Sequence, residues 1–376
     1  MPEKTKKKIQ SKIEMPEKKR KEAVKKKLIL IFPTVVAIAI AVVLIFSGRT
    51  QSSVPGNFFG QEDTSSTAPA RIDCPKKSLF DGRCVDDNES PQPALVGVMI
   101  ENYLEAQPLS GVSKASIVYE APVEGNIPRF LALYAVADTA PEVGPVRSAR
   151  PYFLDWLSEY GDAMYMHVGG SNEALERIKT FNIFDINEFY NGARFWRSKE
   201  RYAPHNTYTS SERWQKAYAD LSEKRNQTPY TGWNFDGQTE CNATTSTSCV
   251  QKISFSYVPG AYEVEWKYNA EKKLYERYQN GVLHKDKDGQ PMIAHTIIVQ
   301  HADMDILDDV GRRGIDTVGK EGTAEVYVLG NKISGTWKKQ TRQSRTEWLD
   351  ENGQSIPLAS EKIWVEVVPT GIVVNN

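Results

Sequence analysis

Residues 94–100 read ALVGVMI, and this apolar run is the pattern of a short, fully buried β-strand. Three further runs extend the pattern along the chain. SIVYE at 116–120 predicts a second strand, the apolar stretch 129–137 a third, and AMYMHV at 163–168 a fourth. These segments indicate a sheet that begins at residue 94.

Helix signals follow these strands. Pro151 fits the first turn of a helix that we expect over 151–160. Ser171 is a good N-cap for a helix over 172–179, and a third helix over 210–224 also begins at a serine. The first half of the folded chain therefore mixes strands with helices.

The second half reads as β-structure. Apolar and polar residues alternate, and Asn280-Gly281 is a strong hairpin turn. We predict strands at 253–258, 262–269, 274–279, 296–304, 324–330, 333–339, 345–350 and 362–369. The predicted fold class is α+β: a mixed α/β N-terminal domain at 94–225, an insert at 226–250, and a β-rich C-terminal domain at 251–373, behind a single transmembrane helix.

That helix is predicted from residues 28–46, LILIFPTVVAIAIAVVLIF, which contain no charged or amide side chain. At 1.5 Å per residue, such a helix spans roughly 30 Å, about the hydrocarbon thickness of a bilayer. A cleaved signal peptide is the competing interpretation, but its apolar core is usually shorter. We therefore expect this segment to be retained as a membrane anchor.

The net charge of −1 conceals an uneven distribution. Residues 1–27 hold twelve Lys or Arg and four Glu, a charge of +8, so the rest of the chain carries 35 Lys or Arg, 44 Asp or Glu, and a charge of −9. Lysines beside a span mark its cytoplasmic side. We expect a single-pass cell-membrane protein with a cytoplasmic N-terminus, an extracytoplasmic body, and no nucleic-acid partner for that body.

Four cysteines lie in two polar, turn-rich segments. Cys74 and Cys84 belong to a flexible stalk at 47–93, and Cys241 and Cys249 to the insert. Three pairings are possible, and the two local ones are favoured. Disulfides persist in oxidising compartments, which agrees with an extracytoplasmic body.

Polar residues gather at the predicted strand ends of the first half, where α/β folds commonly build their sites. We expect one cleft lined by Glu124, Arg129, Arg147, Arg150, His167, His205 and Asn206.

Anion binding is the first role for this cleft. Arg147 and Arg150 flank Ser148 just before a predicted helix N-terminus, and guanidinium groups and helix N-termini both favour anions. The alternative is that these arginines tie a loop to a buried carboxylate.

Acid–base catalysis is the second role. Glu124 lies among apolar residues, which raise the pKa of a carboxyl and suit it to act as a general acid. His167 or His205 is the candidate base, and Glu101 or Glu120 the candidate second carboxylate. The alternative is again structural: Glu124 pairs with Arg129, and each His is hydrogen-bonded within the fold.

Metal and cofactor chemistry finds little support. The histidines are scattered, and the sequence has no His-Glu-x-x-His motif, Walker loop, dinucleotide fingerprint or Gly-x-Ser-x-Gly elbow. We expect no metal and no cofactor.

Several of these segments together resemble the YerB-like family of bacterial envelope lipoproteins. Similar to its N-terminal domain are 94–125, Arg129-Phe130, GPVRSARPY (144–152), HVGGS (167–171) and APHN (203–206); similar to its C-terminal domain are GTAEVYVLGNKISGTWKK (322–339) and KIWVEVVP (362–369). The resemblance implies two linked domains outside the membrane and brings no established reaction. This chain differs in having a transmembrane helix in place of a lipid-modified cysteine, and in its two cysteine pairs.

We therefore expect a membrane-anchored envelope protein whose cleft binds an anionic or glycan-like ligand. The candidate partners are the cell-wall polymer and another envelope protein. One alternative is a cell-wall polymer hydrolase or lyase that uses Glu124 as its general acid. Another is a structural scaffold of an envelope complex.

Overall fold

The computed structural model describes residues 74–376 except 226, 238 and 242–248. Within the chain, Ile72–Asn376 form one compact unit. No helix among the described residues has both the length and the apolar character needed to cross a bilayer. The predicted basic segment, transmembrane helix and most of the stalk fall in residues 1–73 and so lie outside the described part.

Ten strands form one mixed sheet in the order β18-β17-β16-β13-β19-β2-β3-β1-β4-β5. Its strands from the first half of the chain are β1 (Leu95–Glu101), β2 (Ile117–Pro122), β3 (Pro128–Ala135), β4 (Met164–His167) and β5 (Phe184–Asn187). Those from the second half are β13 (Thr296–Ala302), β16 (Lys320–Val328), β17 (Asn331–Lys339), β18 (Glu347–Asp350) and β19 (Ile363–Pro369). The predicted strands of both halves are therefore present.

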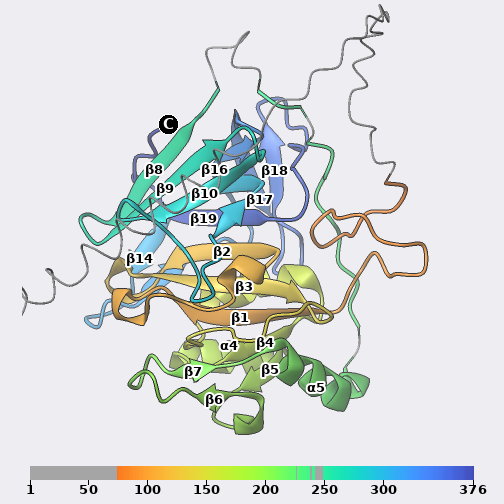
Figure 1. Cartoon of the computed structure of the whole chain (residues 1–376), viewed down its shortest axis with the longest axis vertical. Helices are drawn as coiled ribbons and strands as arrows, with labels where there is room; N and C mark the ends of the chain where they lie inside the picture. Colours follow the sequence, from red (N-terminus) through yellow and green to blue (C-terminus); the bar gives the residue numbers. More distant parts are fainter. Residues whose placement is uncertain (1–73, 226, 238, 242–248) are drawn as a thin grey trace, which may run out of the picture. The chain divides into compact units, whose positions relative to one another are not determined.

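The two halves meet where β19 lies between β13 and β2, hydrogen-bonded to both in parallel. Figure 1 shows blue β19 directly above yellow-orange β2, although the two strands are far apart in sequence. The sheet is therefore continuous from the strands that precede the insert to the strands that follow it.

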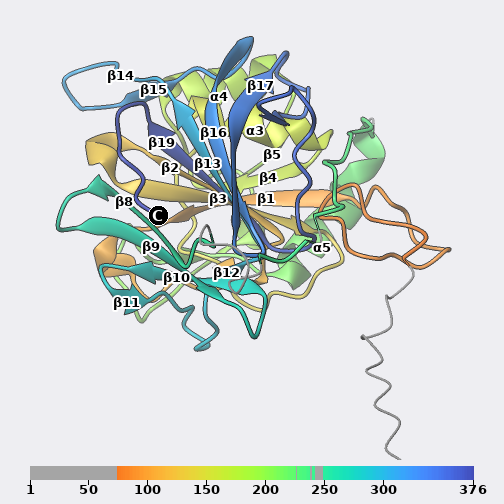
Figure 2. The ribbon, with the colours of Figure 1, turned by 90° about the horizontal axis from the view of Figure 1, so that it is seen from above.

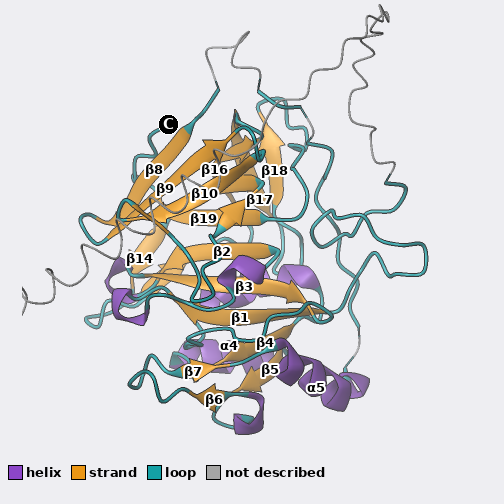
Figure 3. Ribbon diagram, in the orientation of Figure 1, coloured by secondary structure: helices purple, strands orange, loops and turns teal. Residues whose placement is uncertain are grey.

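Helices and a second sheet cover the faces of the ten-stranded sheet (Figures 2 and 3). The helices are α3 (Pro151–Leu157), α4 (Asn172–Thr180) and α5 (Ser211–Leu221). The second sheet contains β8 (Lys252–Val258), β9 (Tyr262–Asn269), β10 (Leu274–Gln279), β11 (Val282–Leu283) and β12 (Ile293–Ala294). Two short two-stranded sheets pair β6 (Trp196–Arg197) with β7 (Thr207–Tyr208) and β14 (Met304–Ile306) with β15 (Arg313–Ile315).

Each face of the large sheet has its own apolar core, because successive strand residues point to opposite faces. On one face, Val98 packs in a cluster with Trp214 of α5 and Trp266 of β9. On the other face, Met99 belongs to a cluster with Phe153 and Trp156 of α3. The structure confirms a sheet-rich α+β fold with a mixed sheet in the first half and a β-rich second half.

Both local disulfides predicted from the sequence are present. Cys74 is bonded to Cys84 and Cys241 to Cys249. Among the described residues no cysteine is free.

A fully buried set of charges joins the second sheet to the large one. Glu120 of β2 and Glu366 of β19 are direct neighbours in register. Arg277 of β10 donates to both oxygens of Glu120, at 2.9 and 2.8 Å, and neither side chain is exposed. Glu366 accepts from Trp266 Nε1 of β9 at 2.8 Å and from the Tyr257 hydroxyl of β8 at 3.2 Å.

Two carboxyl groups therefore lie beside one arginine in this core, and that arginine is bonded to Glu120. Burial, and next the charge of Glu120, raise the pKa of Glu366 well above its usual value. Burial also raises the pKa of Glu120, but the charge and hydrogen bonds of Arg277 oppose this shift, so Arg277 favours the anionic form of Glu120.

Replacing Arg277 with methionine should lower the free energy of unfolding by about 3–5 kcal/mol, because it leaves a buried carboxylate without its cation. Urea denaturation of the purified protein measures the change. Lys272→Met removes a cation from an exposed pair with Glu276 and should change stability by at most about 0.5 kcal/mol. Equal effects of the two substitutions would contradict a structural role for the Arg277–Glu120 pair.

Glu366→Gln should weaken the pH dependence of stability. An acid whose pKa is raised on folding stabilises the native state in acid, and this stabilisation is lost as pH rises through the folded pKa. Glutamine stays neutral at every pH, so the variant should lose less stability than the wild type as the pH rises from 5 to 9, above the usual pKa of a carboxyl group. Denaturant midpoints across this range test it, with the exposed Glu271→Gln as control. Parallel plots of denaturant midpoint against pH for wild type and Glu366→Gln would refute a raised pKa of Glu366.

Candidate functional site

Main-chain hydrogen bonds place the predicted arginines at one edge of the large sheet. Arg147 N donates to Met99 O of β1 at 2.8 Å, and Val168 N, just after β4, donates to Arg147 O at 3.0 Å. Ala149 N then donates to Gly169 O at 3.0 Å. The segment 144–150 is thus held between the ends of β1 and β4.

Glu124 and Arg150 form a two-pronged ion pair on this edge. Arg150 Nε donates to Glu124 Oε1 at 2.7 Å, and Nη2 donates to Oε2 at 2.8 Å. Partial burial acts to raise the pKa of Glu124, but the hydrogen bonds and charge of Arg150 outweigh it and hold this pKa below its usual value. The expected raised pKa is therefore wrong in direction, and the partner of Glu124 is Arg150 rather than Arg129.

A second ion pair lies at the end of β1. His205 Nδ1 is 2.8 Å from Glu101 Oε2, and Arg147 Nε is 3.4 Å from the same oxygen. The ring of Tyr103 stacks on His205 with centroids 5.2 Å apart. Burial raises the pKa of Glu101, although Arg147 and His205 partly offset it. The carboxyl with a raised pKa in this region is Glu101.

Arg129 connects the two pairs. It lies opposite Glu101 in the β1–β3 register and donates from Nη1 to the main-chain oxygen of Ser148 at 2.6 Å. Burial lowers the pKa of Arg129 to about 10, and the charges of Arg150 and Arg147 add to this shift. Residues Glu101, Glu124, Arg129, Arg147, Arg150 and His205 therefore form one cluster, named the arginine cluster below. Ser148 contributes its carbonyl group.

His167 lies apart from any open surface. Its ring is fully buried, with Nδ1 2.7 Å from Gly169 O and Nε2 2.7 Å from Asp185 Oδ1. Both ring nitrogens are occupied within the fold, so the geometry gives His167 a structural role and no free nitrogen for a substrate. The sequence could not show this, because Asp185 comes from the next strand of the sheet.

Asn206 lies on the rim of the cluster. Its side-chain oxygen accepts from Arg197 Nη1 at 3.2 Å, and its carbonyl accepts from Ser198 N at 2.7 Å. The side-chain oxygen of Asn206 is thus partnered within the fold.

Exposed aromatic rings lie on two segments next to the arginine cluster. Tyr202 is 92% exposed, and its carbonyl accepts from His205 N at 3.0 Å. Phe189 and Tyr190 are 64% and 84% exposed and follow β5, and the Phe189 ring closely approaches Gly169. Exposed rings of this size offer apolar faces beside the guanidinium groups. These rings could not be predicted from the sequence, because their exposure is a property of the fold.

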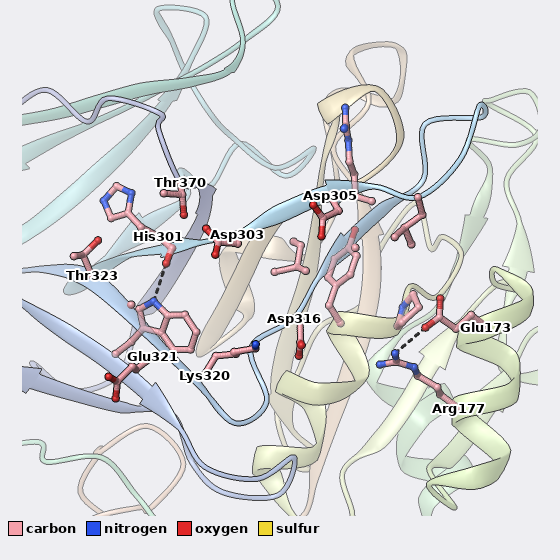
Figure 4. A pocket seen from close by; sticks show the side chains of 18 residues that line it. Glu173, Arg177, His301, Asp303, Asp305, Asp316, Lys320, Glu321, Thr323 and Thr370 are labelled. Carbon is pink, nitrogen blue, oxygen red and sulfur yellow. Dashed lines mark hydrogen bonds and ion pairs between the residues drawn. The ribbon is translucent and has the colours of Figure 1, made fainter.

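A cavity of about 700 Å³ lies on the α3–α4 face of the large sheet (Figure 4). Elements of both halves line it: Tyr152 of α3 and Glu173 of α4, together with Asp303, Asp316 and Trp337 from the second half. The sequence analysis did not single out this region. The available signal was the run HADMDILDDVGRRGID at 301–316, where acids and arginines interrupt a β-rich pattern.

No candidate metal site is found in the described part of the chain. Those residues contain no group of three or more His, Cys, Asp or Glu side chains arranged to hold an ion.

A known family and a solved structure match most of the folded chain. Residues 81–225 match the N-terminal domain, and residues 253–365 the C-terminal domain, of a family described as "Protein of unknown function (DUF3048)". The "Putative lipoprotein YerB" of Bacillus subtilis (strain 168) is 32% identical over 281 residues, which cover 73% of this chain and 81% of that protein. The crystal structure of YerB from Bacillus subtilis has a TM-score of 0.68 and 29% identity, and covers 80% of this chain and 99% of that one.

Glu124→Gln should reduce the free energy of unfolding at pH 7 by about 1–3 kcal/mol, the range for hydrogen bonds to charged groups. A carboxyl whose pKa is lowered on folding stabilises the native state above its unfolded pKa, and this stabilisation is lost as pH falls through the folded pKa. The difference between variant and wild type should therefore vanish in acid, below the folded pKa. Thermal melts from pH 7 to 3 measure it, with exposed Glu176→Gln as control. A difference that grows in acid would show that Glu124 is not held as an anion.

Proposed function

This chain belongs to the DUF3048, YerB-like family, and from that membership and its arginine cluster we propose that it is a cell-envelope protein that binds an anionic glycan. The ligand class follows from the chemistry of the cluster. Three arginines face two carboxylates, so the cluster carries an excess of positive charge before His205 is counted. The proposed partner is the anionic cell-wall polymer.

The proposal rests mainly on Arg147. Among the described residues, its guanidinium makes only long contacts, 3.4 Å from Nε to Glu101 Oε2 and 3.3 Å from Nη1 to Pro204 O, and its side chain is 25% exposed. Arg150, in contrast, is engaged by Glu124 through two short hydrogen bonds. Arg147 therefore has donors left for a carboxylate or phosphate, which guanidinium groups bind in a forked geometry.

The exposed rings beside the cluster support a sugar component. Tyr103 stacks on His205, and Tyr202 projects from the same loop. Burying such rings against an apolar ligand face is favourable, and tyrosine hydroxyls keep a polar handle at the edge. A charged glycan has both kinds of group that this surface can bind: anionic groups for Arg147 and sugar rings for the tyrosines.

The location is part of the proposal. The named relative is a putative lipoprotein, and residues 28–46 of this chain supply an apolar segment of membrane-spanning length. Two disulfides fit an oxidising compartment. We place the folded body outside the cytoplasm, tethered at the membrane by a single helix with a cytoplasmic N-terminus.

A cell-wall hydrolase or lyase is the second candidate, favoured by the contact between His205 and Glu101. A histidine oriented by a carboxylate is a common arrangement for a general base. The lowered pKa of Glu124 makes that residue a poor general acid near neutral pH, so this candidate rests on His205 and Glu101.

Arg147→Gln should weaken binding to purified cell walls about tenfold or more, the equivalent of one charge-assisted contact. Co-sedimentation of the full-length protein with walls measures the affinity, and rising salt should weaken wild-type binding. Walls chemically stripped of their anionic polymers are the second ligand and should bind poorly. Lys272→Gln removes the same charge from an exposed site on the second sheet and should bind like the wild type.

Other outcomes of this experiment separate the candidates. Release of soluble wall fragments that depends on Glu101 and His205 would establish the hydrolase or lyase. If Arg147→Gln lowers the melting temperature and wild-type protein binds neither kind of wall, the binding proposal fails and the scaffold interpretation stands.

A further inference from the structure

The cavity on the α3–α4 face is a built feature of the fold and is separate from the arginine cluster. Its volume of about 700 Å³ lies within the range of small-molecule sites. One wall comes from α3 and α4, and the opposite wall from β13, β16 and β17 with the hairpin β14–β15. Figure 2 shows the loop of this hairpin extending away from the body.

Charged groups of both signs in this cavity lack partners within the protein. Asp303, Asp305 and Asp316 make no hydrogen bond or ion pair through their carboxylates with any described residue, and the ammonium group of Lys320 makes none either. In Figure 4, Lys320 points toward Asp316 with no ion pair between them, whereas Glu173 and Arg177 on the far side are bonded to each other at 2.7 Å. Asp303, Asp305, Asp316 and Lys320 are all exposed, so water hydrates their charged groups and a ligand can reach them.

Arg313 provides the strongest indication of a missing partner. It lines the cavity from β15, and its Nε is covered from solvent yet has no acceptor within the described residues. A buried donor without an acceptor is unfavourable, so most such groups in folded proteins are paired. An acceptor oxygen brought by a ligand would remove this penalty.

Apolar side chains complete the lining. Tyr152 of α3, Trp337 of β17 and Ile315 of β15 are all nearly fully buried, and Leu307 covers Gly314 on the hairpin. Trp337 is fixed in place because its Nε1 donates to His301 O at 2.8 Å. The three buried side chains form the closed floor of the cavity, and Leu307, which is 54% exposed, is the apolar side chain that a ligand can contact.

We propose that this cavity binds a small zwitterion of the peptide class, with its ammonium group at Asp303, Asp305 or Asp316 and its carboxylate at Arg313 or Lys320. A purely cationic ligand would leave Arg313 unmatched, and a purely anionic ligand would face the three free carboxylates. A short peptide supplies both charges and an apolar portion between them. The site is independent of the arginine cluster, which selects anions.

Binding of the dipeptide lysyl-alanine to the purified full-length protein tests the proposal. Isothermal titration calorimetry should show tighter binding of the dipeptide than of putrescine, which carries only amines, or glutarate, which carries only carboxylates. Free lysine in a fourth titration distinguishes an amino-acid site from a peptide site. Asp316→Asn and Arg313→Gln should each weaken dipeptide binding about tenfold or more, because each removes one charged contact.

The controls come from the same hairpin. Asp309→Asn and Arg312→Gln remove the same charges from residues that do not line the cavity, and both should bind the dipeptide like the wild type. Arg147→Gln should also bind normally, which separates this site from wall binding. Failure of the wild type to bind any of the four compounds at millimolar concentration would overturn the proposal. So would equal affinity for lysyl-alanine, putrescine and glutarate, or unchanged affinity in both cavity variants.

Discussion

The pairing of Arg277 with Glu120, beside Glu366, is the interaction on which the arrangement of the two sheets depends. The carboxyl groups come from neighbouring strands of the large sheet, while the three partner side chains come from β8, β9 and β10. Buried charges add little net stability compared with apolar packing, but they tolerate almost no displacement. We infer that this set fixes the position of the second sheet, and that apolar contacts such as Trp266 on Trp364 supply most of the stabilisation.

Local structure was predictable from the sequence because it depends on local patterns. The strand 94–100 and the N-cap at Ser171 appear as expected, since buried runs and capping residues act over a few positions. The joining of the two halves through β19 was not predictable, because the sequence of residues 362–369 does not indicate which strands will pair with them. Long-range register follows from the packing of the whole fold.

The candidate site was predictable in composition but not in detail. Arg147, Arg150, Glu124 and His205 do lie in one cluster, because strand ends at one sheet edge bring distant loops together. The choice of partners depends on distances of a few ångströms between those loops. Glu124 meets Arg150 rather than Arg129, and His167 meets Asp185 inside the sheet. The residue types of a charged site were therefore predictable, whereas the partner of each charged group, which determines the direction of its pKa shift, was not.

The central place of β19 has a consequence for how the chain acquires its structure. During synthesis, β1 to β5 become available long before β19, and until then β2 presents an edge of unpaired main-chain groups. The same holds for β13, whose free side is closed by the same late strand. A nascent chain therefore carries the unpaired edge of β2 from about residue 122 onward and that of β13 from about residue 302, and both edges stay open to wrong pairing until β19 is made.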